Sequence, residues 1–117
     1  MRFQTVLFVL FATVLLMMKA QAATIVALGA SNTYGKGVAR SEAYPAQLQA
    51  MLRAAGYEVT VVNAGVSGDT TAGILKRLDR VVPKGTSVVI FQPGGNDARK
   101  GMAEERSGGI QRIEEAL

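Results

Sequence analysis

The segment Ile25–Gly37, "IVALGASNTYGKG", joins an apolar run to a short polar loop that contains Ser31. The hydroxyl of Ser31 could be a catalytic nucleophile, or it could cap a turn or a helix. A serine hydroxyl is a weak nucleophile unless an adjacent base accepts its proton. The 117 residues contain no histidine, and Lys36 has only its nearness in sequence to recommend it as a base. The segment alone therefore leaves both interpretations of Ser31 open, and it does not supply the usual base for a nucleophile.

Three strand-like runs precede polar loops of this kind. The runs Thr24–Leu28, Glu58–Val62 and Ser87–Phe91 are rich in consecutive apolar residues, which is typical of parallel strands buried on both faces. The loops after them read "GASNTYGKG", "NAGVSGDTT" and "QPGGND". Ligands of open parallel sheets bind outside the carboxyl ends of the strands. We therefore expect the three loops to meet at one edge of a sheet.

Helical segments are expected between and after the strands. Residues 41–56, 69–82 and about 103–117 place apolar side chains three and four positions apart, which is the spacing of a helix face. These side chains are Leu48, Met51 and Leu52; Ile74, Leu75 and Leu78; and Ile110, Ile113 and Leu117. Ser41 and Asp69 are expected to cap the first two helices, and Gly56 to end the first. Alternating strands and helices predict an open α/β fold with right-handed crossovers.

The first loop matches neither of two common phosphate-binding motifs. Five residues separate Gly29 from Gly35, and Gly37 follows Lys36, so the loop is not a Walker A motif. Arg40 stands where a dinucleotide fingerprint starting at Gly35 requires its third glycine. A signalling receiver domain would need acidic residues at the end of the first strand. This chain has Gly29 and Ala30 there, so that class of protein is disfavoured. A flavodoxin-type phosphate loop using Ser31 and Thr33 stays open.

Together the three loops resemble the conserved blocks of the SGNH (GDSL-type) hydrolase superfamily, and in particular its secreted bacterial esterases of the acyl-CoA thioesterase I/lysophospholipase group. The first block, Gly-Asp-Ser-x-Thr, is matched by Gly29–Thr33. The second is matched by Asn63–Thr70, and the third, Gly-x-Asn-Asp, by Gly94–Asp97. The resemblance implies a three-layer αβα fold with a parallel sheet, flavodoxin-like in its arrangement.

The resemblance also implies catalytic roles. Ser31 would be the nucleophile, and the backbone N–H groups of Ser31 and Gly68 with the side-chain amide of Asn96 would form the oxyanion hole. Preorganised donors of this kind stabilise the charge that develops on the carbonyl oxygen during acyl transfer. Simpler interpretations stay open: Gly68 could serve only a positive-φ turn, and Asn96 could cap the third helix. Asp97 is interpreted as structural, an N-cap.

Two residues of the first block need separate comment. Ala30 stands where the superfamily usually has aspartate, which puts the rigidity of the nucleophile loop in doubt rather than the class of reaction. Tyr34 could line an acyl pocket, but a core or rim aromatic is the favoured interpretation.

The superfamily takes its catalytic base from a late Asp-x-x-His block, which these residues lack. Residues 23–117 are therefore expected to be the N-terminal part of a single SGNH hydrolase domain, C-terminally truncated and inactive as printed. Its expected substrate is a small acyl ester or thioester. The strand at Ser87–Phe91 would then be left as an apolar edge. The competing hypothesis is a non-catalytic binding module, either flavodoxin-like or a degenerate hydrolase.

The first 22 residues predict a secretory signal peptide. Arg2 precedes an apolar stretch from Val6 to Met18, and Ala20-Gln21-Ala22 forms a cleavage site. The stretch is shorter than the ~20 residues that cross a bilayer, so a periplasmic or secreted protein without a membrane anchor is expected.

The composition after the signal peptide excludes several classes of function. Without Arg2 and Lys19, 11 of the 13 basic residues remain beside 9 acidic residues, which gives a net charge of about +2. No nucleic-acid patch is visible. The chain has no cysteine, and neither a metal nor a cofactor is expected.

Overall fold

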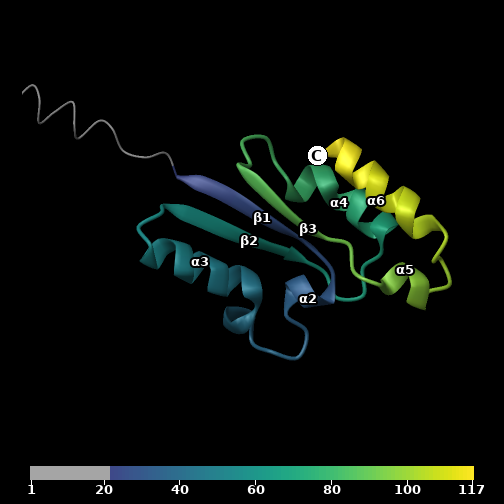
Figure 1. Ribbon diagram of the computed structural model, residues 1–117, viewed down its shortest axis with the longest axis horizontal. Coiled ribbons are helices and arrows are strands. Elements are labelled where there is room, and N and C mark those ends of the chain that lie inside the picture. Colours follow the sequence, from purple (N-terminus) through teal and green to yellow (C-terminus); the bar gives the residue numbers. More distant parts are fainter. Residues whose placement is uncertain (1–21) are drawn as a thin grey trace, which may run out of the picture.

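The computed structural model describes residues 22–117, so the expected signal peptide at residues 1–22 lies almost entirely outside the described residues. Three parallel strands form one sheet in the order β2-β1-β3. They are β1 (Ala23–Gly29), β2 (Val59–Gly65) and β3 (Val88–Gln92). Both crossovers contain a helix, as the alternation in the sequence predicted (Figure 1). The α/β class and the parallel sheet are confirmed.

The helices are short, and two of them were not expected. The elements are α2 (Ser31–Tyr34), the 3-10 turn η1 (Arg40–Glu42), α3 (Tyr44–Ala54), α4 (Thr71–Val81), α5 (Asn96–Arg99) and α6 (Glu105–Ala116). The four-residue helices α2 and α5 follow β1 and β3 and carry Ser31 and Asn96 as their first residues. Helices this short bury too few apolar side chains to leave a periodic pattern in the sequence.

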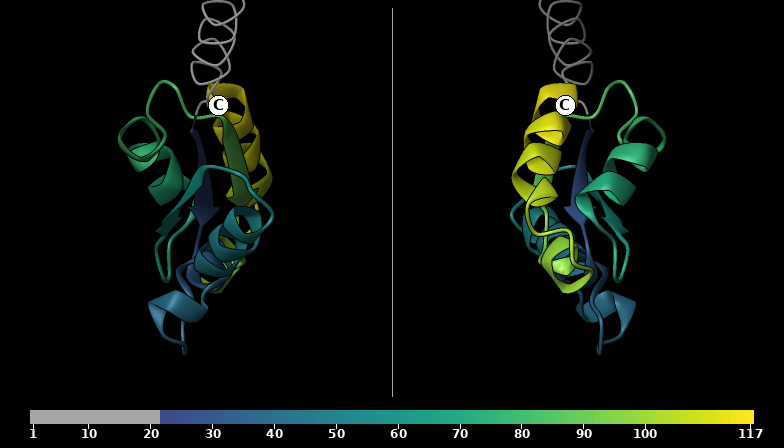
Figure 2. Two further views of the ribbon diagram at one scale, coloured as in Figure 1. Left: turned by 90° about the vertical axis from the view of Figure 1, so that its left-hand side faces the viewer. Right: turned by 90° about the vertical axis from the view of Figure 1, so that its right-hand side faces the viewer.

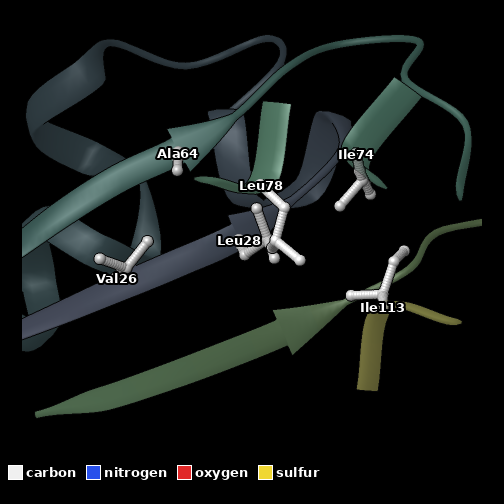
Figure 3. Close-up of a cluster of buried hydrophobic side chains, with 6 residues drawn as sticks. All are labelled: Val26, Leu28, Ala64, Ile74, Leu78 and Ile113. Carbon is white, nitrogen blue, oxygen red and sulfur yellow. The ribbon is translucent and has the colours of Figure 1, made fainter. Parts of the chain in front are cut away.

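Helices cover both faces of the sheet. Side chains alternate along a strand, so neighbouring residues of β1 face opposite sides. Val26 and Leu28 join Ala64, Ile74, Leu78 and Ile113 in a cluster with α4 and α6 (Figure 3). Ala27 packs on the other face with Val59 and Val61, beside Leu48 and Leu52 of α3. The expected three-layer arrangement is therefore confirmed for the described residues.

Several boundaries and contacts differ from the expectation. Strand β2 ends at Gly65, three residues beyond the predicted end at Val62, because its polar Asn63 still pairs with Ala27 of β1. Ser41 lies within η1 rather than capping α3. Met51 was expected in the core but is 70% exposed, since α3 packs on the sheet through a narrower stripe.

The cap of α4 was also assigned to the wrong residue. Thr70 is the N-cap, and its hydroxyl accepts a 3.2 Å hydrogen bond from the backbone N–H of Gly73. The carboxylate of Asp69 instead forms a 2.8 Å ion pair with Arg77. Asp69 is thus held by a partner on the helix that it was expected to cap.

The carboxyl ends of the strands lie together. The arrowheads of β1 and β2 point to the end of the sheet where α2 lies (Figure 1). The side views place the C-terminus at the opposite end of the molecule from the segment that contains η1 (Figure 2). Strand β3 is an edge of the described sheet, and its Val88 is 49% exposed, as the sequence predicted for an apolar edge.

Candidate active site

Ser31 lies directly beyond the carboxyl end of β1. Strand β1 ends at Gly29, Ala30 follows with 3% exposure, and Ser31 begins α2 as a partly exposed residue. Gly35, at φ +89°, ends the helix after one turn. Among residues 22–117, the backbone N–H of Ser31 has no hydrogen-bond acceptor. Both the hydroxyl and this N–H are therefore available to a ligand.

Strands β2 and β3 contribute contacts that fix α2. The hydroxyl of Thr33 donates to Oε1 of Gln92, at the end of β3, over 3.1 Å. The side-chain amide of Asn63, in β2, donates to the backbone carbonyl of Thr33 over 2.9 Å. A Cβ placed on Gly65 would collide with the backbone of Tyr34. Helix α2 is thus held in place by side chains of β2 and β3, although Ala30 stands where the first block usually has aspartate.

Gly68 lies in a tight turn after β2. Its φ is +81°, and the backbone N–H of Asp69 closes the turn on the carbonyl of Val66 over 3.1 Å. The positive-φ role that the sequence left open is therefore real. In the described part of the chain the N–H of Gly68 has no acceptor, while its carbonyl accepts a 2.8 Å hydrogen bond from Nζ of Lys100.

Asn96 is buried, with 7% exposure, at the start of α5. Its side chain forms no capping bond to α5, and α6, which is the third predicted helix, has Glu104 at its N-cap and no side-chain cap bond. Instead Nδ2 donates a 2.8 Å hydrogen bond to the backbone carbonyl of Asp69. A primary amide carries two N–H donors, so one hydrogen remains for another acceptor. The capping interpretation is wrong for Asn96, and its amide is fixed beside the second loop.

A cavity of about 70 Å³ joins the first and third loops. Its lining residues come from the ends of β1 and β3 and the helices after them: Ala30, Ser31, Asn32, Gln92, Gly94, Gly95, Asn96 and Arg99. Ser31 and Asn96 therefore face a common space, whereas Gly68 is not among its lining residues. Larger hollows of about 290 and 360 Å³ are lined by residues such as Pro83, away from Ser31.

Asp97 has a structural role, as predicted, but at a different helix. Its carboxylate accepts hydrogen bonds from the backbone N–H of Thr71 over 2.9 Å and from the Thr71 hydroxyl over 2.6 Å. Asp97 is 2% exposed and Thr71 is the first residue of α4. A carboxylate at a helix N-terminus satisfies free N–H groups and interacts favourably with the helix dipole. Asp97 therefore stabilises the start of α4 from α5.

Tyr34 and Lys36 take no part in the cavity. The Tyr34 ring is 41% exposed, and the Arg40 guanidinium lies 4.6 Å from its centroid. Tyr34 therefore lies at the surface, outside both the core and this cavity. Lys36 is exposed, and its backbone N–H donates a 3.0 Å hydrogen bond to the backbone carbonyl of Ser31. Within residues 22–117 no other group is placed as a base for Ser31.

Sequence reasoning missed Arg77, which is 9% exposed on α4. Its guanidinium donates to the carboxylate of Asp69 and to two strand-end carbonyls. The signal that could have found Arg77 is its place in the helical repeat. Position 77 follows Ile74 by three residues, so a charged side chain falls on the apolar face of the helix.

Residues 22–117 hold no cluster of three or more potential metal-ligating side chains. Over the same residues, no helix combines the length and apolarity needed to cross a membrane.

Comparison with known proteins identifies the family of this chain. The profile of the GDSL-like Lipase/Acylhydrolase family matches residues 27–116. Esterase TesA of Pseudomonas aeruginosa is 41% identical over 93 residues, which are 79% of this chain and 46% of that protein. An arylesterase of Vibrio mimicus is 33% identical over 78 residues, covering 66% of this chain and 39% of its own length.

Solved structures show the same likeness. AlinE4, an SGNH-hydrolase family esterase, superimposes with a TM-score of 0.75 at 37% identity, covering 85% of this chain and 55% of that one. The crystal structure of TesA gives a TM-score of 0.70 at 35% identity, covering 77% and 51%. The chain thus spans about half the length of the relatives that it matches. With the family profile matched from β1 to the end of α6, the chain belongs to the GDSL-like lipase/acylhydrolase family.

Proposed function

We propose that this chain carries the nucleophile and the oxyanion hole of an SGNH-type serine ester hydrolase. Ser31 would attack the acyl carbonyl, and the N–H groups of Ser31 and Gly68 and the amide of Asn96 would bind the oxyanion. The observation that carries the proposal is the cavity shared by Ser31 and Asn96 at the carboxyl edge of the sheet. This is the edge at which open α/β sheets bind ligands.

Free donors in the three loops support this division of roles, although Gly68 does not line the cavity. The N–H groups of Ser31 and Gly68 have no acceptor among the described residues, and Asn96 has one amide hydrogen beyond its bond to Asp69. Such donors bind the tetrahedral intermediate more strongly than the ground-state carbonyl, which lowers the barrier. Because Asn96 is buried and neutral, it can donate without bringing a charge into the site.

The proton acceptor is proposed to come from outside these residues. The chain contains no histidine and spans about half of its relatives' length, so an Asp-x-x-His block in a further segment would supply the triad's acid and base. Nucleophilic serine needs such a base. The 117-residue chain alone is therefore expected to hydrolyse esters at close to the background rate.

The substrate class and location are part of the proposal. Two relatives are described as an esterase and an arylesterase, which supports small acyl esters as substrates here, with thioesters and lysophospholipids as further candidates. No cofactor is needed for this chemistry. The signal-like residues 1–22 support export to the periplasm or medium, with cleavage before Ala23.

Hydrolysis of p-nitrophenyl butyrate tests the proposal. The assay compares the 117-residue chain, any longer product of the same reading frame, and their Ser31→Ala variants. A longer product with an Asp-x-x-His block should turn over the ester, and Ser31→Ala should abolish this activity. Ser67→Ala, an exposed serine in the second loop, is the matched control and should keep full activity. Activity that survives Ser31→Ala would overturn the proposed nucleophile.

The alternative is a non-catalytic binding module. The missing base favours it, as do the hydroxyl-rich loops. It predicts flavin or phosphate that copurifies with the chain and a reading frame without Asp-x-x-His. Mass spectrometry of the native protein and the DNA after codon 117 distinguish the two functions.

A further inference from the structure

Arg77 connects the carboxyl ends of two strands to the second loop. Its Nη1 donates to the carbonyl of Ala64 over 2.7 Å, and Nη2 donates to the carbonyl of Gly29 over 2.9 Å. Its Nε donates to Oδ2 of Asp69 over 2.8 Å. Arg77 and Asp69 side chains are only 9% and 13% exposed, so solvent screens these contacts weakly. One planar guanidinium therefore fixes three chain segments at once.

Two of the three contacts of Arg77, those with Gly29 and Asp69, lie one or two residues from a proposed oxyanion donor. The carbonyl of Gly29 precedes the Ala30–Ser31 pair, and it also accepts a 3.1 Å hydrogen bond from the N–H of Val66. Asp69 follows Gly68 directly. The carbonyl of Asp69 in turn accepts the amide of Asn96. Through Gly29 and Asp69, Arg77 therefore reaches all three donors without lining the cavity itself.

A structural ion pair would not need this geometry. A buried ion pair often gives little net stability because removing both ions from water is costly. Here the carbonyls of Ala64 and Gly29, near the ends of β2 and β1, take up the remaining guanidinium donors. Lysine could not replace this arrangement, because its single ammonium lacks the planar fork that reaches separate acceptors in fixed directions.

We propose that Arg77 is the positioning residue of the oxyanion hole: it sets the distance between the N–H groups of Ser31 and Gly68 and the amide of Asn96. The inference rests on the proposed hydrolase function for its catalytic meaning. Arg77 touches neither substrate nor reacting atoms and acts through Gly29 and Asp69.

Nuclear magnetic resonance of the ¹⁵N-labelled 117-residue chain tests the positioning without requiring turnover. The backbone amide signals of Ser31 and Gly68 and the side-chain amide signals of Asn96 are compared in wild type, Arg77→Met and Arg77→Lys. Arg80→Met, an exposed arginine on the same helix, is the matched control. Ile113→Val is a second control, which lowers stability through the core without touching the site.

The expected result is that Arg77→Met shifts or broadens all three sets of signals, that Arg77→Lys does so less, and that neither control moves them. If Arg77→Met does not fold, Arg77→Lys alone decides. Signals in the Arg77 variants that move no more than in Ile113→Val would overturn the inference and leave Arg77 a stability residue.

Covalent labelling of Ser31 by an alkyl fluorophosphonate gives a second readout in a longer product of the reading frame that contains the Asp-x-x-His block, because the reaction needs a base to accept the Ser31 proton. A misplaced oxyanion hole should slow the labelling step by about tenfold to 10²-fold at an unchanged affinity for the reagent. A change of affinity alone would contradict positioning. If this longer wild-type product is not labelled at all, the proposed nucleophile is wrong, while the resonance experiment on the 117-residue chain still decides the role of Arg77.

Discussion

The side-chain amide of Asn96 donates a 2.8 Å hydrogen bond to the backbone carbonyl of Asp69, which joins the loop after β3 to the loop after β2. The two residues are 27 positions apart in the sequence. This bond fixes one amide hydrogen of Asn96 and directs its side chain, so that the other hydrogen is the one free to bind a ligand. The relationship makes the second and third loops one rigid unit.

Replacing Asn96 by alanine should slow phosphonylation of Ser31 by about 10²–10³-fold, because one oxyanion donor is lost. It should also lower the free energy of unfolding by about 1 kcal/mol through the lost bond to Asp69. Labelling with an alkyl fluorophosphonate and urea unfolding measure the two effects. Asn32→Ala, an exposed asparagine that lines the same cavity, is the control and should label at the wild-type rate. Equal rates for Asn96→Ala and Asn32→Ala would exclude Asn96 from the oxyanion hole.

Gly68→Ala separates the turn role of Gly68 from its donor role. Open space surrounds a Cβ at this position, but alanine at φ +81° should cost roughly 1–2 kcal/mol. Gly37→Ala, at φ +90° and equally uncrowded, should cost a similar free energy of unfolding. Only Gly68→Ala should also slow the labelling of Ser31. If both variants lose the same stability and label alike, Gly68 serves the turn alone.

Asp97→Ala should destabilise the fold by about 2–3 kcal/mol, because the N–H and hydroxyl of Thr71 lose a charged acceptor in a buried place. Urea unfolding monitored by circular dichroism measures the loss. Asp79→Ala, at an exposed position on α4, should change stability by no more than about 0.5 kcal/mol. If Asp97→Ala lowered the free energy of unfolding by no more than Asp79→Ala does, the hydrogen bonds between Asp97 and Thr71 would contribute little to stability.

Gly65→Ala should be among the most damaging single-methyl changes in the chain. The new Cβ would collide with the backbone of Thr33 and Tyr34, so either β2 or α2 must move, at a cost of about 3 kcal/mol or more. The free energy of unfolding and the rate at which Ser31 is labelled should both decrease. Gly108→Ala, inside α6 and facing only the flexible end of Arg112, should instead be neutral or stabilise by about 0.5–1 kcal/mol. A folded Gly65→Ala variant with full labelling would contradict the close packing of α2 on β2.

The strands and the longer helices could be predicted because they depend on local patterns. Consecutive apolar residues marked β1 and β3 to within one residue at each end, and Ile74 and Leu78 marked the buried face of α4. The errors fell where local and tertiary preferences differ. Asp69 is a good N-cap by residue type, but Arg77 binds its carboxylate, and Thr70 caps the helix instead.

By itself the sequence determined the α/β class, the order of its elements and the three polar loops that carry Ser31, Gly68 and Asn96. These follow from hydrophobic period and residue type, which are local properties. Only the tertiary structure decided which side chains meet: that Asn96 binds Asp69, that Asp97 serves α4, and that Arg77 reaches Gly29 across 48 residues. Such contacts depend on the parallel pairing of the strands, which brings their carboxyl ends to one edge although they are far apart in the chain.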